Sequence, residues 1–177
     1  MALTFTDEAK RKIATLRSRY PDPQAACLPV LHLAQDEFGY ISDEAVGLVA
    51  DAIGVPHSHV WGVVTFYTMY HQHPTGKHTL MVCTNVSCML RGGYEVLEAI
   101  EKKLGCKRGE NSADGEFTIV EEECLAACAD APAMISGERY FLRLTPELAM
   151  RALEDIKKMP PDHGHQPPST IAKARKS

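Results

Sequence analysis

The chain has 177 residues, which is enough for one domain with a hydrophobic core and an additional helical part. Hydrophobic residues make up 45% and charged residues 24%, as in ordinary soluble globular proteins, and this composition excludes wholesale disorder and collagen-like repeats. The formal net charge is −4, so the chain lacks the basic excess of a nucleic-acid-binding protein, and no nucleic-acid partner is expected.

The sequence predicts neither a membrane span nor a targeting segment. No apolar run approaches the roughly 20 residues that cross a bilayer, so we expect no direct membrane insertion. The first residues include Asp7 and Glu8 and lack the apolar stretch of a secretory signal, and they are not typical of a transit peptide. We therefore expect a cytoplasmic chain.

Residues 1–73 are expected to form a bundle of four short helices that serves as a docking element. Each helix is indicated by apolar residues at helical spacing and by residues that start or end helices. Thr6 and Ser42 are expected to cap the starts of helices, and Pro56 is expected at the first helical position of the fourth helix. The ending signals are Pro21, Gly39 and Gly54. For Phe66 and Tyr67, near the end of the fourth helix, a face for a partner is one interpretation, and assignment to the helical core is preferred. The bundle carries no pattern of a cofactor site.

Residues 74–159 alternate between strand and helix signals. The predicted strands are 79–83, 117–120, 133–136 and 139–142, and the predicted helices are 89–104 and 145–158. Their order, β-α-β-β-β-α, predicts a small thioredoxin-like α/β layer. The expected fold class is therefore α+β, with an N-terminal helical bundle followed by this domain. Residues 160–177 are rich in Pro and His without apolar periodicity, which predicts a mobile tail.

Cysteine spacing is the most informative feature of the sequence. Of six cysteines, four form two close pairs, Cys83 with Cys88 and Cys124 with Cys128. In a reducing compartment, two tight pairs favour a metal or cluster site over a disulfide framework. Each pair follows a predicted strand, and a parallel β-α-β crossover brings the ends of two such strands side by side. We therefore expect the four thiolates to converge. Cys27 and Cys106 are interpreted as non-ligands.

The spacing within the pairs suits an iron–sulfur cluster better than zinc. Structural zinc sites most often have two residues between paired cysteines, whereas four and three residues lie between the partners here. A [2Fe–2S] cluster has two irons that each take two thiolates, and its formal charge with them is about −2, becoming about −3 on reduction. Backbone N–H groups, the N-terminus of a helix starting near Cys88, and Arg91 are the expected compensating groups.

Two other interpretations of the paired cysteines stay open at this point. One is a zinc site with four cysteine ligands in a structural or adaptor module, and the other is a set of buried thiols with no ligand. A thiol–disulfide enzyme is the weakest alternative, because the sequence contains no Cys-x-x-Cys motif.

Seven groups of residues together form a recognisable pattern: Val82–Cys88, Glu123–Cys128 with Ala131–Pro132, Leu28–Leu31, Gly39–Ile41, Val64–Tyr67, Pro74–Lys77 and Asp114–Thr118. Through them, over about residues 10–158, the chain resembles the E-subunit family of NADH-quinone oxidoreductase, which is respiratory complex I. The family has a thioredoxin-like [2Fe–2S] ferredoxin domain behind an N-terminal helical bundle. One position departs from the family pattern, because Ala126 stands where the family commonly has glycine.

The resemblance implies a function in electron transfer. It implies that one [2Fe–2S] cluster is bound by Cys83, Cys88, Cys124 and Cys128. The cluster then exchanges single electrons with the FMN of an NADH-binding flavoprotein subunit, and FMN and NADH are bound only by that partner. Consistent with this, the chain has no G-x-G-x-x-G loop, and no catalysis is expected from the isolated chain.

The resemblance also implies a setting. As a subunit of NADH:quinone oxidoreductase, an NADH dehydrogenase, the chain is expected to contact other peripheral-arm subunits. It is expected in the cytoplasm, held at the inner face of the cell membrane through the complex. The alternative setting is the equivalent diaphorase subunit of a soluble NAD-linked hydrogenase or formate dehydrogenase.

Overall fold

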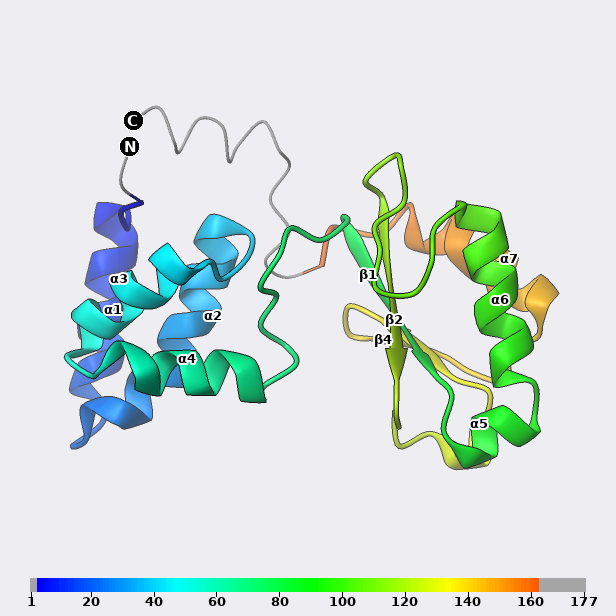
Figure 1. Cartoon of the computed structure of the whole chain (residues 1–177), viewed down its shortest axis with the longest axis horizontal. Coiled ribbons are helices and arrows are strands. Elements are labelled where there is room, and N and C mark those ends of the chain that lie inside the picture. Colours follow the sequence, from blue (N-terminus) through cyan, green and yellow to red (C-terminus); the bar gives the residue numbers. More distant parts are fainter. Residues whose placement is uncertain (1–2, 163–177) are drawn as a thin grey trace. The chain divides into compact units, whose positions relative to one another are not determined.

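The computed structural model describes residues 3–162, which divide into two compact units, residues 3–74 and 75–162 (Figure 1). The first unit is helical. Its elements are α1 (Asp7–Ser18), the short 3-10 helix η1 (Pro23–Ala26), α2 (Cys27–Phe38), α3 (Asp43–Ile53) and α4 (His57–Phe66). The four predicted α-helices are therefore confirmed. No helix between residues 3 and 162 is long and apolar enough to cross a membrane.

The helix ends of the first unit follow from single residues. The Thr6 hydroxyl accepts the Ala9 N–H over 3.2 Å at the start of α1, and the Ser42 hydroxyl does the same for Ala45 at the start of α3. Gly39 ends α2 with φ 84°, a left-handed conformation that glycine adopts without steric cost. These predicted signals are confirmed. Pro56 lies one residue before the first helical position of α4, at its N-cap, so its predicted place is wrong by one residue.

The core of the first unit is built from one apolar face of each helix. Its fully buried members include Val30, Leu31, Val46, Val49, Ile53 and Val60. Tyr67 packs partly buried against this core, but Phe66 is 77% exposed, so its assignment to the core is wrong. The buried stripe of α4 runs through Val60 and Val64, and a residue two positions beyond Val64 points to the opposite side of a helix.

The second unit is a four-stranded sheet with two main helices. Its elements are β1 (His78–Cys83), α5 (Val86–Leu90), α6 (Gly93–Leu104), β2 (Phe117–Glu122), η2 (Cys128–Asp130), β3 (Met134–Ser136), β4 (Arg139–Phe141) and α7 (Pro146–Ile156). The strand order is β2-β1-β3-β4, with β1 and β2 parallel and the other neighbours antiparallel. Mixed helix and sheet in this order confirm the predicted α+β fold class.

Helices α6 and α7 lie side by side against one face of the sheet (Figure 1). Alternate residues of the two parallel strands, Leu80 and Val82 in β1 and Phe117 and Ile119 in β2, are buried under them. This alternation is the period of a strand with one face on a helical layer. The core of the unit therefore holds the two parallel strands firmly and fixes where they end.

Two predicted segments differ from the structure. The helix predicted over 89–104 is divided, because Gly92 adopts φ 94° between α5 and α6. Near the start of the tail predicted from residue 160, Asp162 is bound to β1 and to the residue before this strand. The Asp162 carboxylate accepts the Thr79 N–H over 2.7 Å, and the Asp162 N–H donates to the Lys77 carbonyl over 3.1 Å. The rest of that prediction, residues 163–177, lies outside the described residues.

Candidate metal centre

The two cysteine pairs lie on two loops at the same edge of the sheet. Cys83 is the last residue of β1 and stands opposite Glu122, the last residue of β2. Cys124 follows Glu122 by two residues. Since β1 and β2 are parallel neighbours, the loops that leave them start side by side, as the sequence predicts. Cys88 lies within the short helix α5, and Cys128 is the first residue of η2.

The two pairs differ in burial. Cys83 and Cys88 are each 3% exposed, whereas Cys124 and Cys128 are exposed. Cys83 and Cys88 form a small apolar cluster with Ala131 and Ala133, and residues of the second loop pack against it. The Cys83 Sγ atom lies 3.6 Å from the Glu123 carbonyl oxygen. Cys83 and Cys88 are therefore buried beneath the second loop, whereas Cys124 and Cys128 lie at the surface.

The surroundings of Cys88 disfavour its thiolate form. Burial raises the pKa of its thiol to about 11, and the neighbouring Cys83 and Cys128 contribute to this rise in the pKa. The thiol is therefore protonated at neutral pH when no metal is bound. Because iron binds the thiolate, metal binding at this residue releases a proton.

The donor set fits a cluster of two metal ions. Among residues 3–162, no three His, Cys, Asp or Glu side chains lie close enough together to hold a metal ion as they stand. The thiols are arranged as a buried pair and an exposed pair on adjoining loops. Each iron of a [2Fe–2S] cluster takes two thiolates, so two pairs of thiols supply the number of ligands that such a cluster needs.

The backbone of the second loop is strained at Ala126. This residue has φ 56°, in the left-handed region that non-glycine residues seldom adopt, and its N–H donates to the Cys124 Sγ over 3.4 Å. A backbone N–H directed at a sulfur stabilises the thiolate. Glycine, which the resemblance implies at this position, would adopt the same conformation without strain.

Two arginines bind the segment that follows Cys128. The Arg91 Nε donates to the Ala131 carbonyl over 2.9 Å, and the Arg143 guanidinium pairs with the Asp130 carboxylate at 2.7 and 2.6 Å. The sequence suggests Arg91 as a cation near the sulfurs, and the structure shows that it ties the second loop to the segment after α5. Sequence reasoning misses the Asp130–Arg143 pair, since no pattern signals that these two residues meet.

The first loop is held by the start of α6. A Cβ atom on Gly93 would lie 2.9 Å from the Cys88 carbonyl carbon and 3.1 Å from the Cys83 carbonyl oxygen. Glycine thus allows α6 to pack directly on the backbone of both cysteines. The expected helix N-terminus near Cys88 is confirmed, because the five-residue helix α5 starts at Val86 and Cys88 is its third residue.

The remaining two cysteines belong to the hydrophobic cores of the two units. Cys27 is fully buried in the first unit, where burial raises its pKa to about 11, and Cys106 is buried in the core under α6 and α7. Both positions agree with their interpretation as non-ligands.

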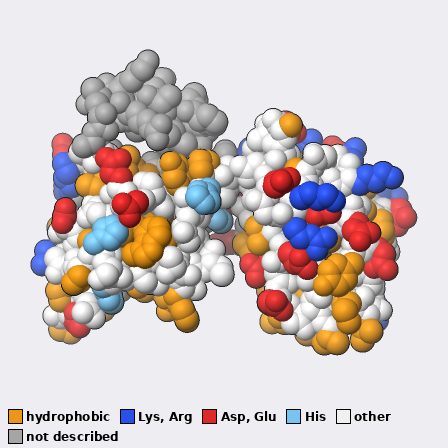
Figure 2. Space-filling view, in the orientation of Figure 1, with side chains coloured by type: hydrophobic (Ala, Val, Ile, Leu, Met, Phe, Trp, Pro, Cys, Tyr) orange, Lys and Arg blue, Asp and Glu red, His pale blue; other side chains and the backbone are white. Residues whose placement is uncertain are grey.

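Helix α5 has an exposed apolar surface next to Cys88. Its exposed apolar side chains are Val86, Met89 and Leu90, and hydrophobic side chains gather at this end of the second unit (Figure 2).

Known proteins resemble the chain over most of its length. Residues 13–157 match the family described as thioredoxin-like [2Fe-2S] ferredoxin. An E subunit of NADH-quinone oxidoreductase from Rhizobium meliloti (strain 1021) is 40% identical over 148 residues, which cover 84% of this chain and 88% of that protein. The E subunit of NADH-quinone oxidoreductase from Escherichia coli (strain K12) is 38% identical over 138 residues, covering 78% of this chain and 83% of that protein.

A solved structure shares the fold. The structure of an NAD+-reducing [NiFe]-hydrogenase in the H2-reduced state matches with a TM-score of 0.65 at 19% identity, covering 76% of this chain and 22% of the hydrogenase chain. The family match, the relatives at 38–40% identity and the paired cysteines on adjoining loops agree with one another. The chain belongs to the thioredoxin-like [2Fe-2S] ferredoxin family, which implies one [2Fe-2S] cluster as its cofactor.

Proposed function

We propose that this chain is a one-electron-transfer subunit of NADH:quinone oxidoreductase, respiratory complex I. Its cluster is held by Cys83, Cys88, Cys124 and Cys128. The observation that carries the proposal is the placement of these four cysteines on two loops that leave neighbouring parallel strands. Relatives that are E subunits of NADH-quinone oxidoreductase, matched over more than four fifths of their length, support the choice of complex.

The residues of the chain have separate tasks at this site. When bound, a [2Fe–2S] cluster accepts and returns one electron at a time. The buried Cys83 and Cys88 keep water from one side of the site, while the exposed Cys124 and Cys128 leave the other side open to a partner. The Ala126 N–H compensates negative charge at Cys124. The exposed apolar side chains of α5 offer a partner a contact surface next to Cys88.

The partner that fits this arrangement is the NADH- and FMN-binding flavoprotein subunit. A flavin takes two electrons from NADH as a hydride and passes them on singly, so it needs a one-electron centre beside it. The chain acts in the cytoplasm, with other peripheral-arm subunits, at the inner face of the membrane through the complex. The same module in a soluble NAD-linked hydrogenase or formate dehydrogenase would use the same residues.

Reduction by NADH tests this function. The purified full chain should give a paramagnetic one-electron signal with a strong chemical reductant and none with NADH. NADH should produce the signal once the flavoprotein is added, because the nucleotide and flavin sites are on that partner. Reduction of the isolated chain by NADH would show a nucleotide site on this chain and overturn the proposal.

A further inference from the structure

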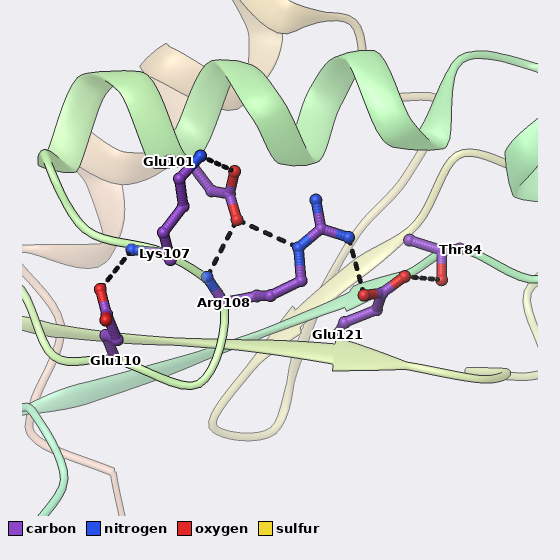
Figure 3. A network of polar contacts seen from close by, with 6 residues as sticks. All are labelled: Thr84, Glu101, Lys107, Arg108, Glu110 and Glu121. Atoms are coloured by element: carbon purple, nitrogen blue, oxygen red, sulfur yellow. Dashed lines mark hydrogen bonds and ion pairs between the residues drawn. The ribbon is translucent and has the colours of Figure 1, made fainter.

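A network of charged side chains runs from helix α6 to the first residue after Cys83 (Figure 3). Arg108 lies at its centre, on the segment between α6 and β2. Its Nη1 pairs with Glu121 Oε2 at 2.7 Å, and its Nε pairs with Glu101 Oε1 at 3.1 Å. The other oxygen of Glu121, Oε1, accepts the Thr84 hydroxyl over 2.8 Å. The two oxygens of one carboxylate thus connect Arg108 to the residue that follows Cys83.

Arg108 is itself held in place from several sides. Its backbone N–H donates to Glu101 Oε1 over 2.9 Å, and the Glu101 side chain is only 5% exposed. The next residue, Gly109, donates its N–H to the Ile119 carbonyl over 2.7 Å, which ties the segment to β2. A planar guanidinium with fixed backbone and two carboxylate partners has little freedom to move. The position of Glu121 therefore depends on a rigid group.

The charges of the network lie close to the candidate metal centre. Glu121 begins the run Glu121–Glu123, which leads directly into Cys124. Thr84, its other partner, adjoins Cys83 and donates its backbone N–H to the Glu122 carbonyl over 3.1 Å. Negative charge here opposes the addition of an electron to a site that is already negative. Arg108 neutralises part of this negative charge through its ion pair with Glu121. Figure 2 shows Lys and Arg side chains among Asp and Glu side chains on one face of the second unit.

We propose that Arg108 is a positioning residue for the metal centre, and that it both fixes Thr84 through Glu121 and offsets carboxylate charge that opposes reduction. The inference rests on the proposed function, since it needs a redox centre on the cysteines. It adds a residue that touches none of the four cysteines. Removing its charge is expected to disfavour the reduced state, and removing the hydroxyl of Thr84 is expected to change the geometry of the first loop.

The test is a redox titration of the purified full chain, followed by electron paramagnetic resonance. Arg108→Gln should lower the equilibrium constant for one-electron reduction about three- to tenfold, and a tenfold change is about 59 mV. Lys107→Gln is the matched control. This change removes the same positive charge one residue away. The Lys107 side chain is 76% exposed, and its ion pair is with Glu101 and not with Glu121. The Lys107→Gln potential should equal that of the wild type.

Four further variants extend the test, and three of them do not contain Arg108→Gln, so the test stays decisive if that variant folds poorly. Glu121→Gln should raise the potential, and Arg108→Gln combined with Glu121→Gln should return it toward the wild-type value. Thr84→Val should alter the paramagnetic spectrum without a change of charge, and Thr84→Ser should restore it.

The outcomes separate this inference from the proposed function. A wild-type chain with a cluster whose potential and spectrum do not change in Arg108→Gln, Glu121→Gln and Thr84→Val would overturn the inference alone. Equal shifts in Lys107→Gln and Arg108→Gln would do the same, because they would indicate a general charge effect. A wild-type chain that binds no iron would overturn the proposed function and the inference together.

Discussion

Ala126 shows how one residue connects backbone strain to the candidate site. Its φ of 56° costs an L-residue roughly 1–2 kcal/mol, yet the conformation directs its N–H to Cys124 Sγ. Strain of this kind persists where the surroundings over-determine a loop. Here the Asp130–Arg143 ion pair and the Arg91 bond to Ala131 hold the far end of the same loop.

Replacing Ala126 by glycine should therefore stabilise the protein. We expect Ala126→Gly to raise the free energy of unfolding by about 0.5–1 kcal/mol, because relief of strain exceeds the added freedom of the unfolded chain. Urea unfolding followed by circular dichroism measures the change, and the iron content should stay as in the wild type. Ala127→Gly is the control, since Ala127 has φ −110° and gains nothing from glycine. Equal effects of both changes would contradict the assignment of strain to Ala126.

Sequence and structure agree on the cysteines and differ on the residues around them. The pairs and their place after two strands could be predicted, because they depend on spacing along the chain, whereas the departure at Ala126 comes from the resemblance to the family. The contacts of Arg91, Arg108 and Arg143 could not, because each of these arginines bonds to a partner 13 or more residues away along the chain. The burial of one pair and exposure of the other also depend on packing.

At the scale of elements, the break between α5 and α6 shapes the first loop. Periodicity predicts one helix over 89–104, because apolar residues continue at helical spacing through both pieces. The structure divides it at Gly92, and Gly93 then packs on the backbone of Cys88 and Cys83. Pattern alone does not reveal a close approach of two backbones, although two consecutive glycines are a signal that such an approach is possible.

A side chain at Gly93 should disturb this packing. We expect Gly93→Ala to lower the free energy of unfolding by about 2–3 kcal/mol and to reduce the iron content, because the Cβ would meet backbone atoms that cannot rotate away. Thermal unfolding and iron analysis are the measurements. The control is Gly62→Ala in α4, where no atom lies within 4 Å of the added Cβ and the helix should gain up to about 1 kcal/mol. A stable, fully loaded Gly93→Ala protein would contradict the close packing.

The segment between α6 and β2 makes stability depend on acid. The Arg108 backbone N–H, with the side chains of Arg108 and Lys107, lowers the pKa of Glu101 from 4.5 to about 2. Because the folded-state pKa is depressed, this stabilisation is complete above pH 4.5 and is lost as the pH falls toward 2.

Glu101→Gln should make stability less sensitive to acid in that range. Urea unfolding of the metal-free chain at about pH 5 and about pH 3 should show a smaller loss in Glu101→Gln than in the wild type, by roughly 1–3 kcal/mol. The metal-free chain is used because loss of sulfide from a bound cluster in acid would itself change the measured free energy of unfolding. Equal losses in both proteins would show that Glu101 titrates normally.

At the scale of the whole molecule, we assign different tasks to the helical unit and the cluster unit. The first unit, residues 3–74, has its own core and carries none of the paired cysteines. Its fourth helix leaves Trp61 and Phe66 exposed. These features support the prediction that the bundle serves assembly rather than electron transfer.

Removal of residues 1–73 tests this division. The shortened chain should keep the visible colour of an iron–sulfur cluster, because all four proposed ligands remain, and it should no longer co-purify with the flavoprotein subunit. The full chain is the reference for both measurements. Undiminished co-purification of the shortened chain would contradict the docking role.

The content of iron, acid-labile sulfide and zinc in the purified full chain tests the central claim most directly. We expect about two irons and about two sulfides per chain. The same content is expected in Cys27→Ser and Cys106→Ser, and loss of the cluster is expected in Cys83→Ser, Cys88→Ser, Cys124→Ser and Cys128→Ser. About one zinc per chain with no sulfide would contradict the claim, because the four thiols would then hold a structural zinc ion.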